Sequence, residues 1–324
     1  MKNKFSNHKE VAPIGSYKMK NLNMTKIKHK GIRHGSLLFD VINYIFLGLT
    51  AFICLLPIIN VLAISFSSSG ASAAGRVTLW PVEFNMESYR YAFTRPQFVG
   101  SFWISVQRTI VGLCVNMLLT VLTAYPLSRS KDELSGRNIY AWFFFITMVF
   151  NAGLVPWYLA IRQFGLLDSF WALIIPSALP VFNAIILMNF FKQLPRELSE
   201  SALIDGAGHF TILFRIFLPV SLPAVATVAL FSIVWHWNDW FTGLILIKKM
   251  ELTPLQTYLQ SLVVVRDTTT LAAASRETLE MLSVISDRTL KSAQIFIATV
   301  PILMVYPFLQ KYFTKGLVIG SVKG

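Results

Sequence analysis

Six long apolar stretches constrain the fold of this chain more than any other feature. A helix that crosses the hydrocarbon core of a bilayer needs about 20 mostly apolar residues, and six segments meet or approach that length. Because 54% of the 324 residues are hydrophobic and only 14% are charged, an ordinary soluble domain is excluded. The sequence predicts an all-α integral membrane protein with six transmembrane helices. The predicted spans are Val41–Ile64, Phe102–Tyr125, Ile139–Ile161, Ser169–Phe191, Leu218–Trp237 and Ala293–Gln310.

The distribution of Lys and Arg predicts the orientation of these spans. Residues 1–36 contain nine Lys and Arg against one acid, Glu10. If this segment is cytoplasmic, 18 of the 29 Lys and Arg lie on the cytoplasmic side, as the positive-inside rule requires. We therefore expect residues 1–36 to form a basic cytoplasmic tail, residues 37–313 a multi-pass membrane domain, and residues 314–324 a second cytoplasmic tail. The net charge of +13 then reflects topology and says little about a substrate.

A polar segment with many small side chains, residues 192–217, separates the fourth and fifth spans. Pro195 is well suited to start a helix. Arg196 to Asp205 then suits a short helix that Gly206 can end, and a second short helix from about Phe210 leads to the fifth span. The small side chains leave room for a partner to approach the backbone. On spacing alone, the segment is either such a docking element or a plain cytoplasmic loop with a turn.

The polar segment resembles the EAA signature of permease subunits of ATP-binding-cassette (ABC) importers. That signature reads Glu-Ala-Ala, three residues, Gly, nine residues and Ile-x-Leu-Pro, and this chain departs from it only by a serine in the second position. The resemblance implies the type I ABC importer permease fold. Residues 192–217 would then hold the cytoplasmic coupling helices that contact an ATPase subunit. The residues implied in this coupling are Glu200, Ser201, Ala202, Asp205, Gly206, Ile216, Leu218 and Pro219.

The resemblance extends from the first span to the last residue and is nearest to carbohydrate permeases of the maltose-permease kind. Supporting runs begin at Ala124 (Ala-Tyr-Pro-Leu-Ser-Arg), His236 (His-Trp-Asn-Asp-Trp) and Tyr306 (Tyr-Pro-Phe-Leu-Gln-Lys-Tyr-Phe). This resemblance implies import of oligosaccharides across a bacterial inner membrane by alternating access, with alginate or another uronate oligosaccharide as a candidate substrate. The implied partners are a second homologous permease, two ABC ATPase subunits, an external solute-binding protein and membrane lipid, with no nucleic acid.

An aromatic and polar cluster at the outer end of the fifth span is a candidate for the substrate pathway. Aromatic faces with hydrogen-bonding groups suit sugar rings, but they also suit an aromatic belt at the membrane interface. On a continuous helix, Trp235 and Asp239 share one face, as do His236 and Trp240. Asp239 would repel an acidic sugar. The cluster consists of Trp235, His236, Trp237, Asn238, Asp239 and Trp240.

Two asparagines complete the candidate pathway. Asn151 and Asn183 interrupt the third and fourth spans, where each either faces the pathway or bonds to a neighbouring helix.

Residues 65–100 and 248–290 form the predicted external loops. In maltose-type permeases the second of these loops reaches into the sugar cleft of the binding protein. Its alternating charges suit such a transient interface and equally suit a solvated loop.

Catalytic and cofactor motifs are absent from the sequence. It has no G-x-x-x-x-G-K-[ST] phosphate loop, H-E-x-x-H pair, cysteine pair or G-x-S-x-G turn. We therefore expect no catalytic residue, metal or cofactor in this chain, with ATP and Mg bound by the partner ATPase subunits. The spans also lack the buried acids and bases that mark proton-driven carriers. The alternatives are a stand-alone secondary transporter or channel, and an integral-membrane enzyme that uses His236 and Asp239.

Overall fold

The computed structural model describes residues 34–264 and 287–321. Every regular element in these residues is a helix, either an α-helix or a short 3-10 or π-helical turn. The predicted all-α class is confirmed. Most of the predicted N-terminal tail, residues 265–286 of the predicted second external loop and the last three residues of the chain lie outside the described residues.

Each of the six predicted spans coincides with a candidate membrane span, although three of them are bent pairs of helices. The unbroken candidates lie in α1 (His34–Ser65), α4 (Pro96–Ser128) and α15 (Asp287–Ser321). The bent pairs join α5 (Arg137–Val149) to α6 (Leu154–Gln163) at 115°, the 3-10 turns Phe170–Ser177 to α7 (Val181–Lys192) at 47°, and His209–Val220 to α11 (Leu222–Asn238) at 86°.

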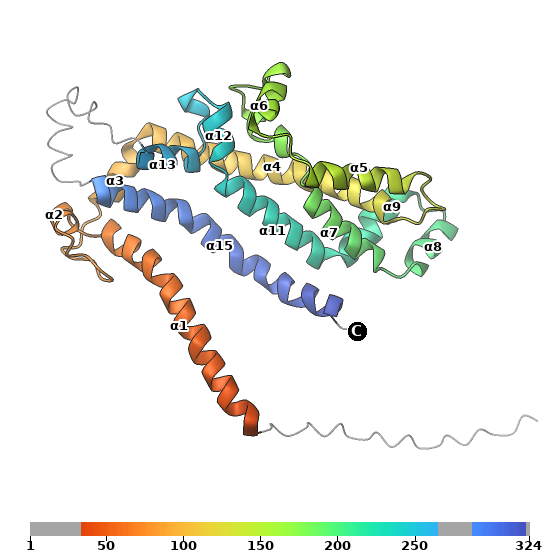
Figure 1. Cartoon of the computed structure of the whole chain (residues 1–324), viewed down its shortest axis with the longest axis horizontal. Helices are drawn as coiled ribbons and strands as arrows, with labels where there is room; N and C mark the ends of the chain where they lie inside the picture. The colour runs from red at the N-terminus through yellow and green to blue at the C-terminus, as the bar shows by residue number, and fades with distance from the viewer. Residues whose placement is uncertain (1–33, 265–286, 322–324) are drawn as a thin grey trace, which may run out of the picture. The chain divides into compact units, whose positions relative to one another are not determined.

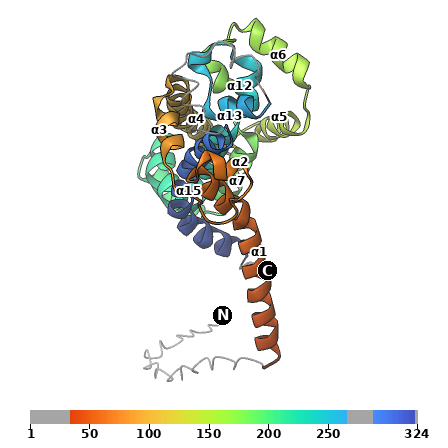
Figure 2. The same cartoon turned by 90° about the vertical axis from the view of Figure 1, so that its left-hand side faces the viewer.

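The third predicted span is broken where its sequence is least helical. The backbone of Gly153 has a φ of +90°, which L-residues with a side chain rarely adopt, and α6 begins directly after it. The side-chain oxygen of Asn151 accepts a hydrogen bond from the N–H of Gly153 at 2.9 Å, so this asparagine shapes the turn. Beyond the turn, α6 runs away from α5 (Figures 1 and 2), and its Ile161 is buried in an apolar cluster with residues 172–174 and with Leu246 and Ile247.

The chain divides into two compact units, residues 1–53 and 54–324. In the first unit, the described residues belong to the N-terminal part of α1. Its apolar side chains, such as Ile45 and Phe46, are exposed, which suits a helix whose neighbours are lipid chains or another subunit. The second unit holds the remaining elements.

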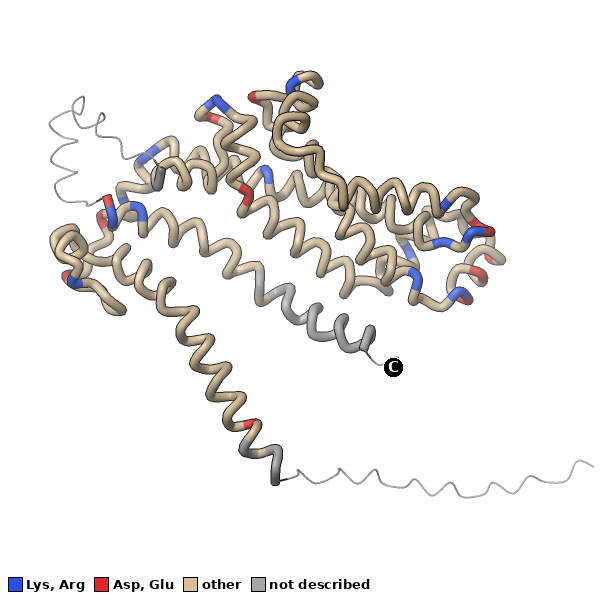
Figure 3. Tube along the Cα trace, in the orientation of Figure 1, with Lys and Arg blue, Asp and Glu red and all other residues tan. Residues whose placement is uncertain are grey.

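Helix α4 is central to the second unit. It packs against α7 and α11, and α11 also packs against α15, so that these helices run side by side (Figure 1). One apolar cluster lies where α4 and α7 meet the polar segment, and another where α3 (Glu87–Thr94) and α13 (Leu255–Val264) meet α4 and α15. Charged residues gather toward the ends of these helices, with few between them (Figure 3).

Candidate functional site

The polar segment 192–217 folds into short helices, as its sequence predicts. Helix α8 spans Glu197–Ile204, directly after Arg196. After a turn, α9 (His209–Ile212) continues into a π-helical turn, Leu213–Phe217, and then into α10 (Leu218–Val220). Single π-helical turns are rare and often occur at functional sites.

Gly206 terminates α8 in a Schellman motif. Its φ is +79°, its N–H donates to the carbonyl of Leu203 at 3.0 Å, and the N–H of Ala207 donates to the carbonyl of Ala202 at 2.9 Å. No atom of the described chain outside its neighbours lies within 4 Å of where a Cβ at residue 206 would be. Glycine is therefore needed here for its backbone conformation, while packing within the chain leaves room for a side chain.

Phe217 anchors the polar segment to the membrane helices. It is buried, and its ring contacts Tyr125 of α4 and Phe191 of α7 edge-on, with centroid distances of 5.4 Å and 5.6 Å. The guanidinium of Arg129, just after α4, lies over the rings of both Tyr125 and Phe217. Ile216 also packs against this cluster. Phe217 thus connects the polar segment directly to the ends of α4 and α7.

The opposite face of the polar segment is exposed and partly apolar. Glu200, Ser201 and Gly206 are exposed, while Ala202 is buried against the core. Sequence reasoning missed two large apolar side chains beside Gly206: Ile204 is 87% exposed and Phe210 is 71% exposed. In the sequence, these two apolar residues flank the small and polar residues 205–209, and this contrast is a signal that sequence reasoning could have used. Large exposed apolar side chains rimmed by polar residues mark protein-interaction sites.

The structure separates the members of the aromatic cluster. Trp237 is buried, and its indole N–H donates to the carbonyl of Ala298 in α15 at 2.9 Å. The prediction that His236 and Trp240 share one helical face is wrong, because α11 ends at Asn238 and the backbone of Asp239 is extended. His236 is buried, whereas Trp235, Asn238 and Trp240 remain exposed. These three side chains are the ones accessible to a ligand.

The two candidate asparagines lie in different environments. Asn151 is exposed in the turn between α5 and α6. Asn183 is buried in α7, and its amide nitrogen lies 3.3 Å from the hydroxyl of Ser232 and 3.4 Å from the carbonyl of Val228, both in α11. Its polar atoms thus connect two packed helices.

A buried ion pair joins α4 to the end of α11. Arg108 of α4 is fully buried and donates to the carboxylate of Asp239, and to its backbone carbonyl at 2.7 Å. The expectation that the spans lack buried charge is therefore wrong for Arg108. The same pair also changes the expectation for Asp239, because its charge is compensated by the guanidinium and it is not a free carboxylate. The other carboxylate oxygen accepts from the N–H of Thr242 at 3.1 Å.

Gly112 allows α4 and α11 to approach closely beside this ion pair. A Cβ at this position would lie 2.4 Å from Nε2 of the buried His236. With its amide nitrogen turned toward the carbonyls of Gly112, Ser177 and Ala178, Asn116 presents its oxygen to the same Nε2 at 3.2 Å. His236 is thus an interhelical packing residue whose Nε2 edge lies against Gly112 and Asn116 of α4.

Gly112→Ala is expected to destabilise the folded chain by about 1–3 kcal/mol, because the added methyl overlaps the His236 ring in a packed site. Gly100 of the same helix is the matched control, since nothing lies within 4 Å of its virtual Cβ. Gly100→Ala should leave stability unchanged or raise it, because alanine is the better helix former. Thermal unfolding in detergent measures both, and equal melting temperatures for the two variants would contradict this packing account.

Comparison with known proteins places the chain in a family. It matches the family described as "Binding-protein-dependent transport system inner membrane component" over residues 33–319. It is 43% identical over 286 residues to Protein LplC of Bacillus subtilis (strain 168), covering 88% of this chain and 95% of that protein. It is 41% identical over 292 residues to the polygalacturonan/rhamnogalacturonan transport system permease protein YtcP of the same organism, covering 89% and 99%.

A solved structure supports the same assignment. The chain resembles the crystal structure of a bacterial ABC transporter involved in the import of the acidic polysaccharide alginate, with a TM-score of 0.79 and 32% sequence identity. The match covers 87% of this chain and 99% of that chain. The chain therefore belongs to the family of inner membrane components of binding-protein-dependent transport systems, the permease subunits of ABC transporters.

Proposed function

We propose that this permease imports uronate oligosaccharides, driven by partner ATPase subunits that contact the polar segment. Two relatives support the substrate class: one is a polygalacturonan/rhamnogalacturonan transport permease, and the other takes part in the import of alginate, an acidic polysaccharide. The compensated charge of Asp239 removes the main objection to an acidic sugar near the aromatic cluster. Trp235, Asn238 and Trp240 are accessible and offer the aromatic faces and amide that a sugar ring needs.

The observation that carries the coupling role is the exposed face of α8 and α9. It combines the EAA-like spacing with Ile204 and Phe210, which are left exposed although the opposite face of the segment is anchored by Phe217. An ATPase subunit that covers this face would move the ends of α4 and α7 through that anchor. In this proposal both chain termini and the polar segment are cytoplasmic, and the aromatic cluster lies toward the outer side.

Transport then follows from two states of the membrane helices. The ATPase dimer closes on ATP and shifts the polar segments of this chain and of its partner permease. The helix bundle changes from inward-facing to outward-facing and receives sugar from the external binding protein. Because a ligand shifts such an equilibrium only by its differential affinity for the two states, both ATP and the loaded binding protein must favour the same state.

Ile204→Ser is expected to weaken association with the ATPase subunit by about tenfold or more without lowering the stability of the chain. In this proposal Ile204 is one of the few interface side chains that carry most of the binding free energy, whose truncation costs about 2 kcal/mol or more, while the same change on a free surface costs little. Phe164→Ser is the matched control, since Phe164 is 79% exposed and follows α6, at the outer end of the third predicted span. Co-purification yield and titration of the ATPase subunit check this, and wild-type affinity for Ile204→Ser would remove this residue from the interface.

The substrate class is tested by the ATPase activity of the co-purified complex in lipid. Binding protein loaded with oligogalacturonate or oligoalginate should stimulate activity, whereas maltodextrins of the same length should not. Stimulation by the neutral oligosaccharides alone would refute the uronate assignment and leave the permease role intact.

A further inference from the structure

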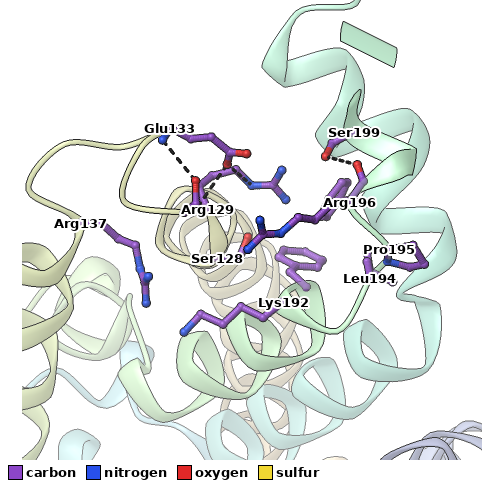
Figure 4. A pocket seen from close by; sticks show the side chains of 12 residues that line it. Ser128, Arg129, Glu133, Arg137, Lys192, Leu194, Pro195, Arg196 and Ser199 are labelled. Carbon is purple, nitrogen blue, oxygen red and sulfur yellow. Dashed lines mark hydrogen bonds and ion pairs between the residues drawn. The ribbon is translucent and has the colours of Figure 1, made fainter. Parts of the chain in front are cut away.

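A small cavity lies where the ends of α4, α5 and α7 meet the start of α8 (Figure 4). Its volume is about 260 Å³. The aromatic rings of Phe191 and Phe217 contribute to its lining, and both are buried. The cavity therefore has a rigid apolar wall, provided by the cluster that anchors the polar segment.

The cavity is lined by many more cations than anions. Arg129, Arg137, Lys192 and Arg196 line it, against the single acid Glu133. Glu133 is bound to Arg129 at 3.9 Å, and no carboxylate in the described part of the chain forms an ion pair with the other three cations. The side chains of Arg137 and Lys192 lie next to each other (Figure 4). Like charges held this close repel, so the arrangement favours an anion between them.

Two hydrogen-bond donors at this cavity also lack acceptors. The Nε atoms of Arg129 and Arg137 are buried, and neither finds a hydrogen-bond partner in the part of the chain that the structure describes. For Arg129, the distance to Glu133 is too long for a hydrogen bond. Buried donors are normally satisfied. The guanidinium of Arg129 is held in place by Tyr125 and Phe217, at 4.6 Å and 4.4 Å from their ring centroids.

We propose that this cavity binds a phosphate group, presented by the headgroup of an anionic phospholipid of the inner leaflet. Several guanidinium groups and a lysine provide the charge-assisted donors that phosphate oxygens accept. The volume is below the range typical of sites for whole small molecules, so it suits a phosphate with a short headgroup. Basic pockets between membrane helices on the cytoplasmic side bind such headgroups. The lipid source therefore depends on the orientation proposed above.

Because the cavity lies between α8 and the membrane helices α5 and α7, a bound phosphate would connect them. Arg196 immediately precedes α8 and Ser199 lies within it, while Arg137 begins α5 and Lys192 ends α7. An anion held by all of these elements ties the first coupling helix to the membrane helices. Loss of the anion would leave the cations to repel one another and loosen this connection.

The test is a lipid titration of the complete co-purified complex, followed by native mass spectrometry. Phosphatidylglycerol should bind in preference to phosphatidylcholine. The double variant Arg137→Gln/Lys192→Gln should bind phosphatidylglycerol at least about tenfold more weakly, since removing even one charge-assisted hydrogen bond is expected to weaken binding by that factor. Lys131→Gln is the matched control, because Lys131 is an exposed cation of the same loop that does not line the cavity. It should bind as the wild type does.

Further arms separate the sources of the phosphate. In one arm, inorganic phosphate is compared with chloride at equal ionic strength. If phosphate raises the melting temperature of the wild-type complex but not of the double variant, and the complex does not prefer phosphatidylglycerol to phosphatidylcholine, the ligand is a soluble phosphate and not a lipid. Arg196→Gln alone provides a second variant should the double variant assemble poorly. Wild-type affinity for phosphatidylglycerol and an unchanged response to phosphate in both variants would overturn the proposal.

Discussion

Asp239→Asn is expected to destabilise the folded chain by about 3–5 kcal/mol. Arg108 is fully buried within a membrane-spanning helix, and Asp239 supplies the compensating charge. Removing one member of a buried ion pair leaves the other charge uncompensated, which costs far more than the pair itself contributes. The Nε atom of Arg108 already lacks a hydrogen-bond partner in the described chain, and after the substitution the guanidinium keeps the backbone carbonyl of residue 239 as a neutral acceptor, which does not compensate its charge. Chemical or thermal unfolding in mixed micelles measures the loss.

Two further variants isolate the cause. Glu83→Gln breaks an ion pair of the same chemical kind, Arg76–Glu83 at 3.3 Å, but both side chains are more than half exposed. It should unfold as the wild type does, because exposed ion pairs contribute little. Arg108→Leu/Asp239→Leu removes both charges and should recover much of the stability lost in Asp239→Asn. A double variant no more stable than Asp239→Asn would show that packing, and not the unpaired charge, controls this site.

Gly206→Asp is expected to reduce the stimulation of the partner ATPase by loaded binding protein to the basal rate. Within the chain, residue 206 has open space around it, so a side chain meets an obstacle only in a partner that approaches the backbone. The positive φ adds a backbone cost of about 1–2 kcal/mol for most L-residues.

Three substitutions separate these causes. Gly206→Ala keeps the backbone cost with little bulk, whereas Gly206→Asn has the bulk in a residue that tolerates the left-handed conformation. If partner contact is decisive, Gly206→Asn should fail and Gly206→Ala should retain most of the stimulation. Gly75→Asp is the matched control, because Gly75 has a φ of +69° and equally open surroundings in the predicted first external loop. Failure of Gly206→Ala with full activity of Gly206→Asn would assign the effect to backbone strain.

The sequence predicts well those features that depend on local composition. Each of the six apolar stretches forms a helix, or a bent pair of helices, that is long and apolar enough to cross a membrane. The end of α8 at Gly206 follows from a local rule for glycine at helix ends. Residues that interrupt a helix, Asn151 and Gly153, lie where the third span bends.

Features that depend on tertiary structure were not predictable in this way. Arg108 and Asp239 are 131 residues apart, and no periodicity pairs them. The helical face predicted for His236 and Trp240 is wrong because α11 ends at Asn238, where the backbone carbonyl of Asp239 accepts a hydrogen bond from Arg108 of α4. The cation cluster around Arg137 and Lys192 combines helix ends that are far apart in the sequence. Ile204 is exposed because α8 turns Ala202 toward the core, and this orientation is set by the packing of α8 against other helices.

Import of uronate oligosaccharides, driven by partner ATPase subunits, is tested most directly by the uptake of labelled oligosaccharide into proteoliposomes. The liposomes would contain either this chain alone or the complex with its partner permease and ATPase subunits, with loaded binding protein added outside. The account predicts uptake only by the complex, only with ATP inside, and not by the Gly206→Asp complex. Uptake by the chain alone, driven by an ion gradient and unaffected by Gly206→Asp, would contradict it and identify a secondary transporter.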